Sequence, residues 1–161
     1  MADTSPLMAV QNADAVVVTG GTINGTAIGG TTAAAGAFTT VTASGNIASS
    51  GYVSGSVGNA LTAVGTNRAT SLALVAQVNN ITSAAASTGV TLPTVASVGI
   101  GAVVIIFNGG ASAITVYGAG SDTIDAVAAT TGVPLTNAKR CAYYAVAAAT
   151  WVSAQLGVVS A

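Results

Sequence analysis

Two neighbouring carboxylates are the residues of this sequence whose type and spacing could support catalysis. Asp122 and Asp125 stand close together in Gly-Ser-Asp-Thr-Ile-Asp, and a glycosidase needs two facing carboxyl groups. Both side chains are also suited to accept backbone N–H bonds in turns, and we expect that structural role rather than catalysis. A calcium site is not expected there either, because two carboxylates fall short of the roughly six to eight oxygen ligands that calcium takes.

Other catalytic and binding arrangements lack an essential residue. The chain has no histidine, which excludes a Ser-His-Asp or Cys-His arrangement. Gly99-Ile100-Gly101 lacks the third glycine of a dinucleotide loop, and Gly-Lys-Ser/Thr does not occur. With three basic residues in the chain, binding to nucleic acid is not expected. We therefore predict a protein that is not an enzyme, with no catalytic residues, no metal site and no cofactor.

The last part of the chain holds a basic cluster, a cysteine and two large aromatic residues. Lys139 and Arg140 are expected at a solvated strand entrance, or alternatively in an ion pair with the acidic surface of a partner or a neighbouring subunit. Cys141 is the only cysteine, so no intrachain disulfide can form, and we predict a small core residue. Tyr144 and Trp151 are predicted to anchor the core.

The low charge of the chain indicates a surface that partners cover. Charged residues make up 4% of the sequence, where soluble domains have roughly 25%. An isolated monomer of this kind would resist precipitation poorly, so we expect partners to cover much of its surface, with Ser, Thr, Asn and Gly keeping the rest wet. The most apolar stretch, Thr94–Phe107, is too short for a spanning helix and suits a buried strand, so no membrane partner is expected.

Three regions differ in composition. Residues 1–17 form a short N-terminal arm, residues 18–66 are rich in Gly, Ser and Thr, and residues 67–161 show strand-like alternation. Single apolar residues punctuate the middle region, although a flexible linker needs none. Three copies wound together could bury these residues on a shared axis, and this predicts a trimerising fibrous segment. The predicted assembly contacts are Ile23, Ile28, Phe38, Val41, Ile47, Val53 and Val57.

Residues 67–161 predict a compact β domain. Ala102–Phe107 is a continuous apolar strand that ends at Asn108-Gly109, a strong hairpin signal, and Ala113–Tyr117 is its expected partner. Arg140–Ala147 alternates, and after a short turn Trp151–Val159 closes the domain. The fold class predicted for the whole chain is therefore all-β: an extended arm, a fibrous segment and an antiparallel β-sandwich or barrel, assembled as a trimer.

Two stretches of the sequence resemble known proteins. Gly20–Gly29 (GGTINGTAIG), followed by AFTTVTASG ending at Gly45, resembles a motif of tailed-phage fibre and appendage proteins, which usually form trimeric shafts or spikes. The second half is similar to a small β domain that recurs in phage structural proteins, through VTLP ending at Pro93, ITVY ending at Tyr117 and Thr150-Trp151. Together these resemblances imply a phage virion protein that forms a homotrimer.

The expected function is mechanical. We predict a homotrimeric capsid decoration or cement protein that stabilises the head by bridging capsid subunits, with itself and the major capsid protein or other virion proteins as partners. Lys139 and Arg140 are possible capsid contacts. The alternative is a short tail fibre or head fibre that binds a host surface glycan. The expected location is the virion, on the capsid surface rather than the tail, after synthesis in the host cytoplasm.

Overall fold

In a computed structural model of the protein, residues 41, 43, 44, 47 and 51–157 are described. The chain divides into two units, Met1–Ala48 and Ser49–Ala161, and the second contains every described strand. The predicted arm, 1–17, and most of the predicted fibrous segment lie outside the described residues.

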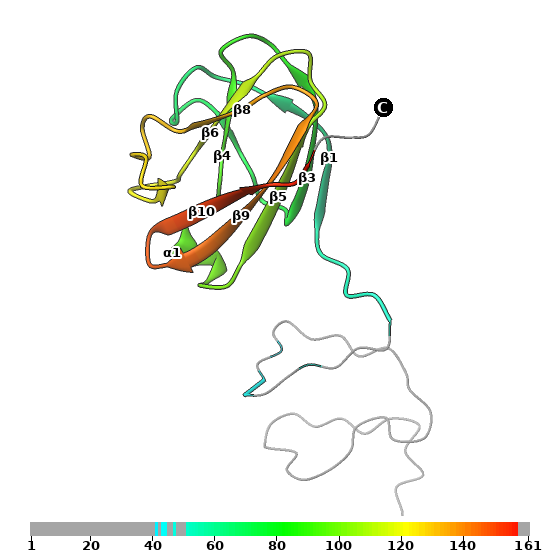
Figure 1. Ribbon diagram of the computed structural model, residues 1–161, viewed down its shortest axis with the longest axis vertical. Helices are drawn as coiled ribbons and strands as arrows, with labels where there is room; N and C mark the ends of the chain where they lie inside the picture. Colours follow the sequence, from blue (N-terminus) through cyan, green and yellow to red (C-terminus); the bar gives the residue numbers. More distant parts are fainter. Residues whose placement is uncertain (1–40, 42, 45–46, 48–50, 158–161) are drawn as a thin grey trace, which may run out of the picture. The chain divides into compact units, whose positions relative to one another are not determined.

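The second unit is an all-β domain, as predicted (Figure 1). Its strands are β1 (Val57–Ala63), β2 (Leu72–Ala73), β3 (Val78–Ala84), β4 (Gly89–Thr91), β5 (Val103–Asn108), β6 (Ile114–Tyr117), β7 (Thr123–Ile124), β8 (Val133–Leu135), β9 (Lys139–Ala147) and β10 (Thr150–Gln155). The described residues contain one short helix, α1 (Val95–Val98), whose first turn is capped by the Thr94 side chain. None of the described helical structure is long and apolar enough to cross a membrane.

The strands form two sheets that share one core. The six-stranded sheet has the order β1-β3-β5-β9-β10-β7, and the four-stranded sheet has the order β2-β4-β6-β8. From β1 to β8 the chain changes sheet at every step, and β9 and β10 then form a hairpin within the larger sheet. This alternation makes the domain a two-layered sandwich in which every connection between consecutive strands except that of β9 and β10 crosses from one layer to the other.

The prediction of an antiparallel domain was wrong, because both sheets are mixed. β1, β3 and β5 are parallel to one another, as are β2, β4 and β6, whereas β9 runs antiparallel to β5 and β8 antiparallel to β6. The physical cause is the alternation between layers: a chain that crosses to the other sheet and returns enters the first sheet again in its original direction.

The predicted hairpin at Asn108-Gly109 is instead a crossing between the layers. β5 lies in the six-stranded sheet and β6 in the four-stranded one, so they are not paired. The buried Asn108 side chain holds this connection: its Nδ2 donates to the carbonyl oxygens of Ser112 and Leu135, and its Oδ1 accepts from the backbone N–H of Gly110. An Asn-Gly pair therefore marks a turn here without pairing the strands on either side.

Side chains from both layers fill the core. The six-stranded sheet contributes Ile81, Val104, Ile106, Tyr143 and Trp151, and the smaller layer contributes Val90, Leu92, Ile114, Val116 and Leu135. Cys141 is buried as predicted, and Trp151 is completely buried.

The compact domain begins before the predicted boundary at residue 67. β1 (Val57–Ala63) pairs with β3 from its first residue to its last, apart from a bulge near Ala60, and the buried Ala63 belongs to the core. The composition of 18–66, rich in Gly, Ser, Thr and Ala with single apolar residues, predicts a fibrous segment that includes these residues. Pairing with a neighbouring strand supplies the ordering that their composition does not predict.

Candidate functional site

The outer face of the six-stranded sheet is the candidate functional site, and alternation along β9 defines it. Cys141, Tyr143 and Ala145 point into the core. The residues between them point to the opposite side, so Tyr144 and Val146 are on the surface, 40% and 50% exposed. The prediction that Tyr144 anchors the core was wrong, because it lies on the outward side of the pleat.

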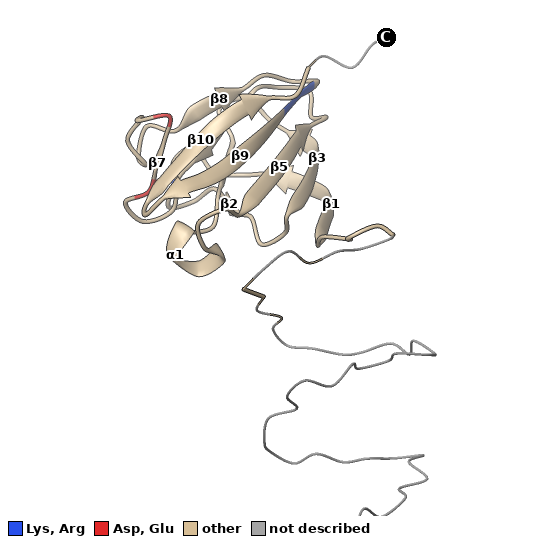
Figure 2. Cartoon of the chain, turned by 60° about the horizontal axis from the view of Figure 1, so that its bottom comes forward, with Lys and Arg blue, Asp and Glu red and all other residues tan. Residues whose placement is uncertain are grey.

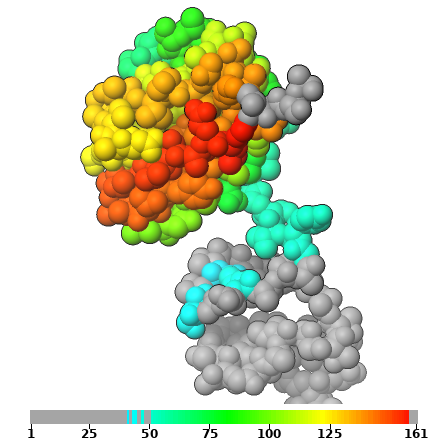
Figure 3. Space-filling view, viewed as in Figure 1, coloured from blue at the N-terminus to red at the C-terminus, as the bar shows by residue number. Residues whose placement is uncertain are grey.

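One end of this face carries exposed apolar side chains. The register aligns Val103 of β5, Tyr144 of β9 and Val152 of β10 in a row across three strands, and Val146 lies beside them. Val152 is 41% exposed, and these four residues are called the apolar patch below. Figure 3 shows the orange and red atoms of β9 and β10 at the surface of the domain.

The middle of the face continues this apolar character. Val57, Val78, Ile105, Ala142 and Ala154 are aligned in a second row that crosses five strands. Val57, on the first strand of the sheet, is 65% exposed. The row joins the apolar patch to the opposite end of the face.

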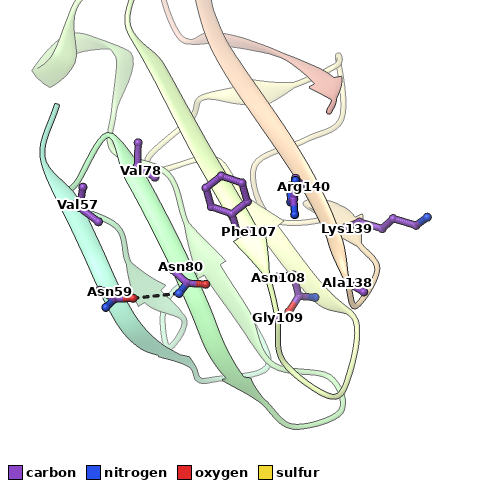
Figure 4. A pocket seen from close by; sticks show the side chains of 10 residues that line it. All are labelled: Val57, Asn59, Val78, Asn80, Phe107, Asn108, Gly109, Ala138, Lys139 and Arg140. Atoms are coloured by element: carbon purple, nitrogen blue, oxygen red, sulfur yellow. Dashed lines mark hydrogen bonds between the residues drawn. The ribbon is translucent and has the colours of Figure 1, made fainter. Parts of the chain in front are cut away.

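That opposite end is an open groove of about 570 Å³ (Figure 4). A row of polar and aromatic residues crosses it. Asn80 donates its amide hydrogen to Oδ1 of Asn59 over 3.0 Å, and next to them the guanidinium of Arg140 lies 5.4 Å from the centroid of the Phe107 ring. Lys139 extends outward at the rim (Figure 4). The groove thus combines the bonded amides of Asn59 and Asn80, two cations and an apolar wall, and the buried Asn108 also lines it.

The two cations at the groove have no acidic partner within the described residues. Both described aspartates are bound elsewhere. Buried Asp122 accepts from the backbone N–H of Val95, and Asp125 accepts from the backbone N–H and the hydroxyl of Ser153. Both carboxylates thus accept backbone N–H bonds, as expected, but from distant segments of the chain rather than within their own turns. Figure 2 shows the basic residues at the start of β9 and the acidic residues near β7, at the other end of β10.

Both edges of the six-stranded sheet are poorly suited to pair with another strand. The register of β1 is broken near Ala60, which has a φ of 53°, so the edge strand carries a bulge. At the other edge β7 has only two residues, and beyond it the Asp125 side chain occupies the N–H of Ser153. Bulges and short edge strands oppose edge-to-edge association, which leaves the outer face as the surface available for contact.

Most of the predicted assembly contacts remain predictions. Ile23, Ile28 and Phe38 lie outside the described residues. Val41, Ile47, Val53 and Val57 are all exposed in the single chain, by 61%, 67%, 83% and 65%. Val57 belongs to the outer face, while Lys139 and Arg140 line its groove.

Sequence reasoning missed the apolar patch and the two groove asparagines. A signal for the patch was present, because β9 has apolar residues on both sides of its alternation, as in Tyr143 and Tyr144. A strand with only one buried face needs polar residues on the other. The asparagines carry no such signal, since Asn59 and Asn80 meet only through the parallel pairing of β1 and β3.

Beneath the face, burial changes the acidity of two core groups. The pKa of the Tyr143 hydroxyl is raised far above its ordinary value, first because of desolvation and then because of the neighbouring Cys141. Desolvation also raises the pKa of the Cys141 thiol. Both groups are therefore neutral near pH 7, and they act as packing residues rather than as nucleophiles.

Comparisons with protein-family models, with curated proteins and with solved structures find no match for this chain.

Proposed function

We propose that the chain is a bacteriophage virion structural protein, a homotrimeric capsid decoration or cement protein that stabilises the head by bridging capsid subunits. The observation that carries the proposal is the apolar patch on a sheet face whose two edges are blunted. A surface of this kind favours association with another protein. The low overall charge supports the same proposal, since 4% charged residues suit a surface that partners cover.

In this proposal the patch is a contact between sister subunits. Val146 and Val152 are each about half-exposed in one copy, so association has apolar area left to bury. Such contacts need no chemistry: they hold neighbouring proteins together and oppose pressure from inside the head. In the same proposal the segment that precedes β1, from residue 18 onward, adds a second set of contacts along the threefold axis, and the arm 1–17 reaches a neighbouring capsid subunit.

A second candidate is a short tail fibre or head fibre that binds a host surface glycan. One observation favours it: the groove presents the amides of Asn59 and Asn80 beside the cation of Arg140, and such groups can bind sugar hydroxyl and carboxylate groups. The two candidates differ in where the protein sits on the particle.

Electron microscopy of the particle tests the proposal directly. The expected result is density for the protein in a regular arrangement on the head, and density on the tail alone would overturn the cement function in favour of the fibre. Light scattering on the purified protein tests the trimer, and a monomer at micromolar concentration would contradict it. A phage that lacks the protein should lose infectivity at a lower temperature than the wild type.

A further inference from the structure

We infer that the groove at the Arg140 end of the outer face binds a carboxylate carried on an extended peptide segment of a partner virion protein. The inference rests on the proposed function for the identity of the partner, and on the groove itself for the chemistry. It concerns a site distinct from the apolar patch, which lies at the other end of β9.

Charge is the first argument. Lys139 and Arg140 are adjacent cations in a domain whose two described carboxylates are both occupied elsewhere. The Arg140 guanidinium lies over the Phe107 ring, 5.4 Å from its centroid, so a cation–π contact favours this position of the side chain. An arginine held in this way is suited to a carboxylate, which it binds through two parallel N–H···O bonds.

The amide pair is the second argument. Nδ2 of Asn80 and Oδ1 of Asn59 are used in the bond between them. Nδ2 of Asn59 and Oδ1 of Asn80 have no other partner among the described residues, so the pair offers both N–H donors of Asn59 and the acceptor oxygen of Asn80 at the groove. A peptide backbone presents the complementary acceptor and donor at every residue.

The spacing of the rows is the third argument. The row that includes Asn80 and Arg140 lies two residues along the strands from the row that includes Val57 and Val78. This separation is about 7 Å, which equals the distance between residues i and i+2 of an extended peptide, whose side chains share one face. An apolar residue followed two positions later by an acidic one therefore matches both rows.

The aromatic ring distinguishes a peptide from a sugar. Sugar sites commonly present an open aromatic face to the C–H groups of a pyranose ring. In this groove the guanidinium of Arg140 lies over the Phe107 ring, and Tyr144 lies in the apolar patch at the other end of β9. The groove therefore favours an acidic peptide over an acidic glycan.

The test uses the full chain and a capped peptide, Gly-Val-Ser-Asp-Ser-Gly, labelled with a neutral dye and followed by fluorescence anisotropy. We expect Arg140→Gln to weaken binding at least about tenfold, because a charge-assisted hydrogen-bond pair is lost. Lys139→Gln should weaken it about twofold, since a half-buried ammonium at the rim lacks the planar fork that binds a carboxylate through two bonds. Arg68→Gln is the matched control: it removes the same charge from a residue bonded to the Gly120 carbonyl oxygen, and it should leave binding unchanged.

Two further peptides test the chemistry without altering the protein. Replacing Asp by Asn in the peptide should abolish binding, and moving Asp next to Val should weaken it, because the two side chains then point to opposite faces. Equal binding of the Asn peptide, or equal affinities of the Arg140→Gln and Arg68→Gln proteins, would overturn the inference. Tighter binding of an oligogalacturonate than of the peptide would overturn it in favour of a glycan.

The same variants separate this inference from the proposed function. If the Arg140→Gln protein still forms trimers and decorates particles as well as the wild type, the groove inference fails and the cement function stands. If the wild type binds the acidic peptide but no phage head, the groove inference stands and the cement function fails. Thermal unfolding of each variant confirms folding, and Arg140→Lys, which keeps the charge but loses the planar fork, should bind with intermediate affinity.

Discussion

A carboxylate placed in the apolar patch should dissociate the proposed trimer. Val152 is 41% exposed on the outer face, in the same row as Tyr144. In Val152→Asp the side chain meets water in a monomer, but in a subunit contact it would be buried without a partner. Analytical ultracentrifugation over a range of protein concentrations measures the effect as a shift in the midpoint of dissociation.

The magnitude follows from the exposed fraction. Burying a whole valine side chain contributes about 1.5–3 kcal/mol, so the exposed 41% of Val152 accounts for about 1 kcal/mol per subunit. Burial of an unpaired polar group costs a further 1–3 kcal/mol or so. We take about 2 kcal/mol per subunit, which gives about 6 kcal/mol for the trimer. The midpoint concentration varies with the square root of the trimer dissociation constant, so about 3 kcal/mol of this shifts the midpoint, roughly a hundredfold.

Val64→Asp is the matched control for this experiment. Val64 is 42% exposed, nearly the same as Val152, but it pairs with Gly89 of the smaller sheet and lies outside the patch. It should leave the midpoint unchanged. Equal shifts for the two variants would refute the assignment of the patch to the subunit contact. If the wild-type protein is a trimer, the absence of a shift for Val152→Asp would refute it as well.

Three more predictions concern the domain itself. Gly132→Ala should reduce the free energy of unfolding in urea by about 2–5 kcal/mol, because φ is +66° and a Cβ would lie 2.7 Å from the Val116 carbonyl oxygen. Gly120→Ala is its control: φ is a similar +56°, but the nearest contact of a Cβ is at 3.9 Å, so the loss should be only about 1–2 kcal/mol. Equal losses in the two variants would contradict the packing argument. Asn108→Ala should cost about 2–4 kcal/mol, since it leaves buried backbone groups of the layer crossing unpaired; a neutral result would show that water replaces these bonds. Because burial raises the pKa of Tyr143, its contribution to the free energy of unfolding should be fully present below the ordinary tyrosine pKa of about 10 and should decline as the pH rises above it. Urea unfolding at pH 8 and pH 11 measures this decline, and Tyr143→Phe should flatten it.

Strand positions were largely predictable from the sequence, but their pairing was not. Ile114–Tyr117 and Val103–Asn108 lie within one residue of the predicted strands, because runs of β-branched residues favour the extended backbone wherever they pair. Which sheet a strand joins depends on the connection. Asn108 uses its side chain to hold a crossing, and a local Asn-Gly signal does not distinguish a crossing from a hairpin.

The candidate site was predictable only in part. Lys139 and Arg140 stood out as the one basic cluster, and the structure places both at the groove. The patch was missed because β9 has a tyrosine on each side, and alternation alone does not tell which side faces the core. On the core side of β9, Tyr143 is flanked by two smaller residues, Cys141 and Ala145, and Trp151 of β10 is paired with Ala145. This packing of Trp151 beside a small residue depends on the pairing of β10 with β9, which the sequence of β9 alone does not predict.

The positions of the few charges explain how a domain with so little charge can present one face for contact. Arg68 is bonded to the Gly120 carbonyl oxygen, and both described aspartates accept hydrogen bonds from backbone N–H groups, Asp125 from that of Ser153, which follows Val152 in the sequence. The two remaining cations are at the groove, at the opposite end of β9 from Val146. None of the four patch residues carries a charge that association would have to desolvate, while the groove keeps two cations that select an acidic partner. If the patch provides the affinity between subunits and the groove provides the selectivity for an acidic peptide, raising the salt concentration should weaken peptide binding and leave trimer association largely intact.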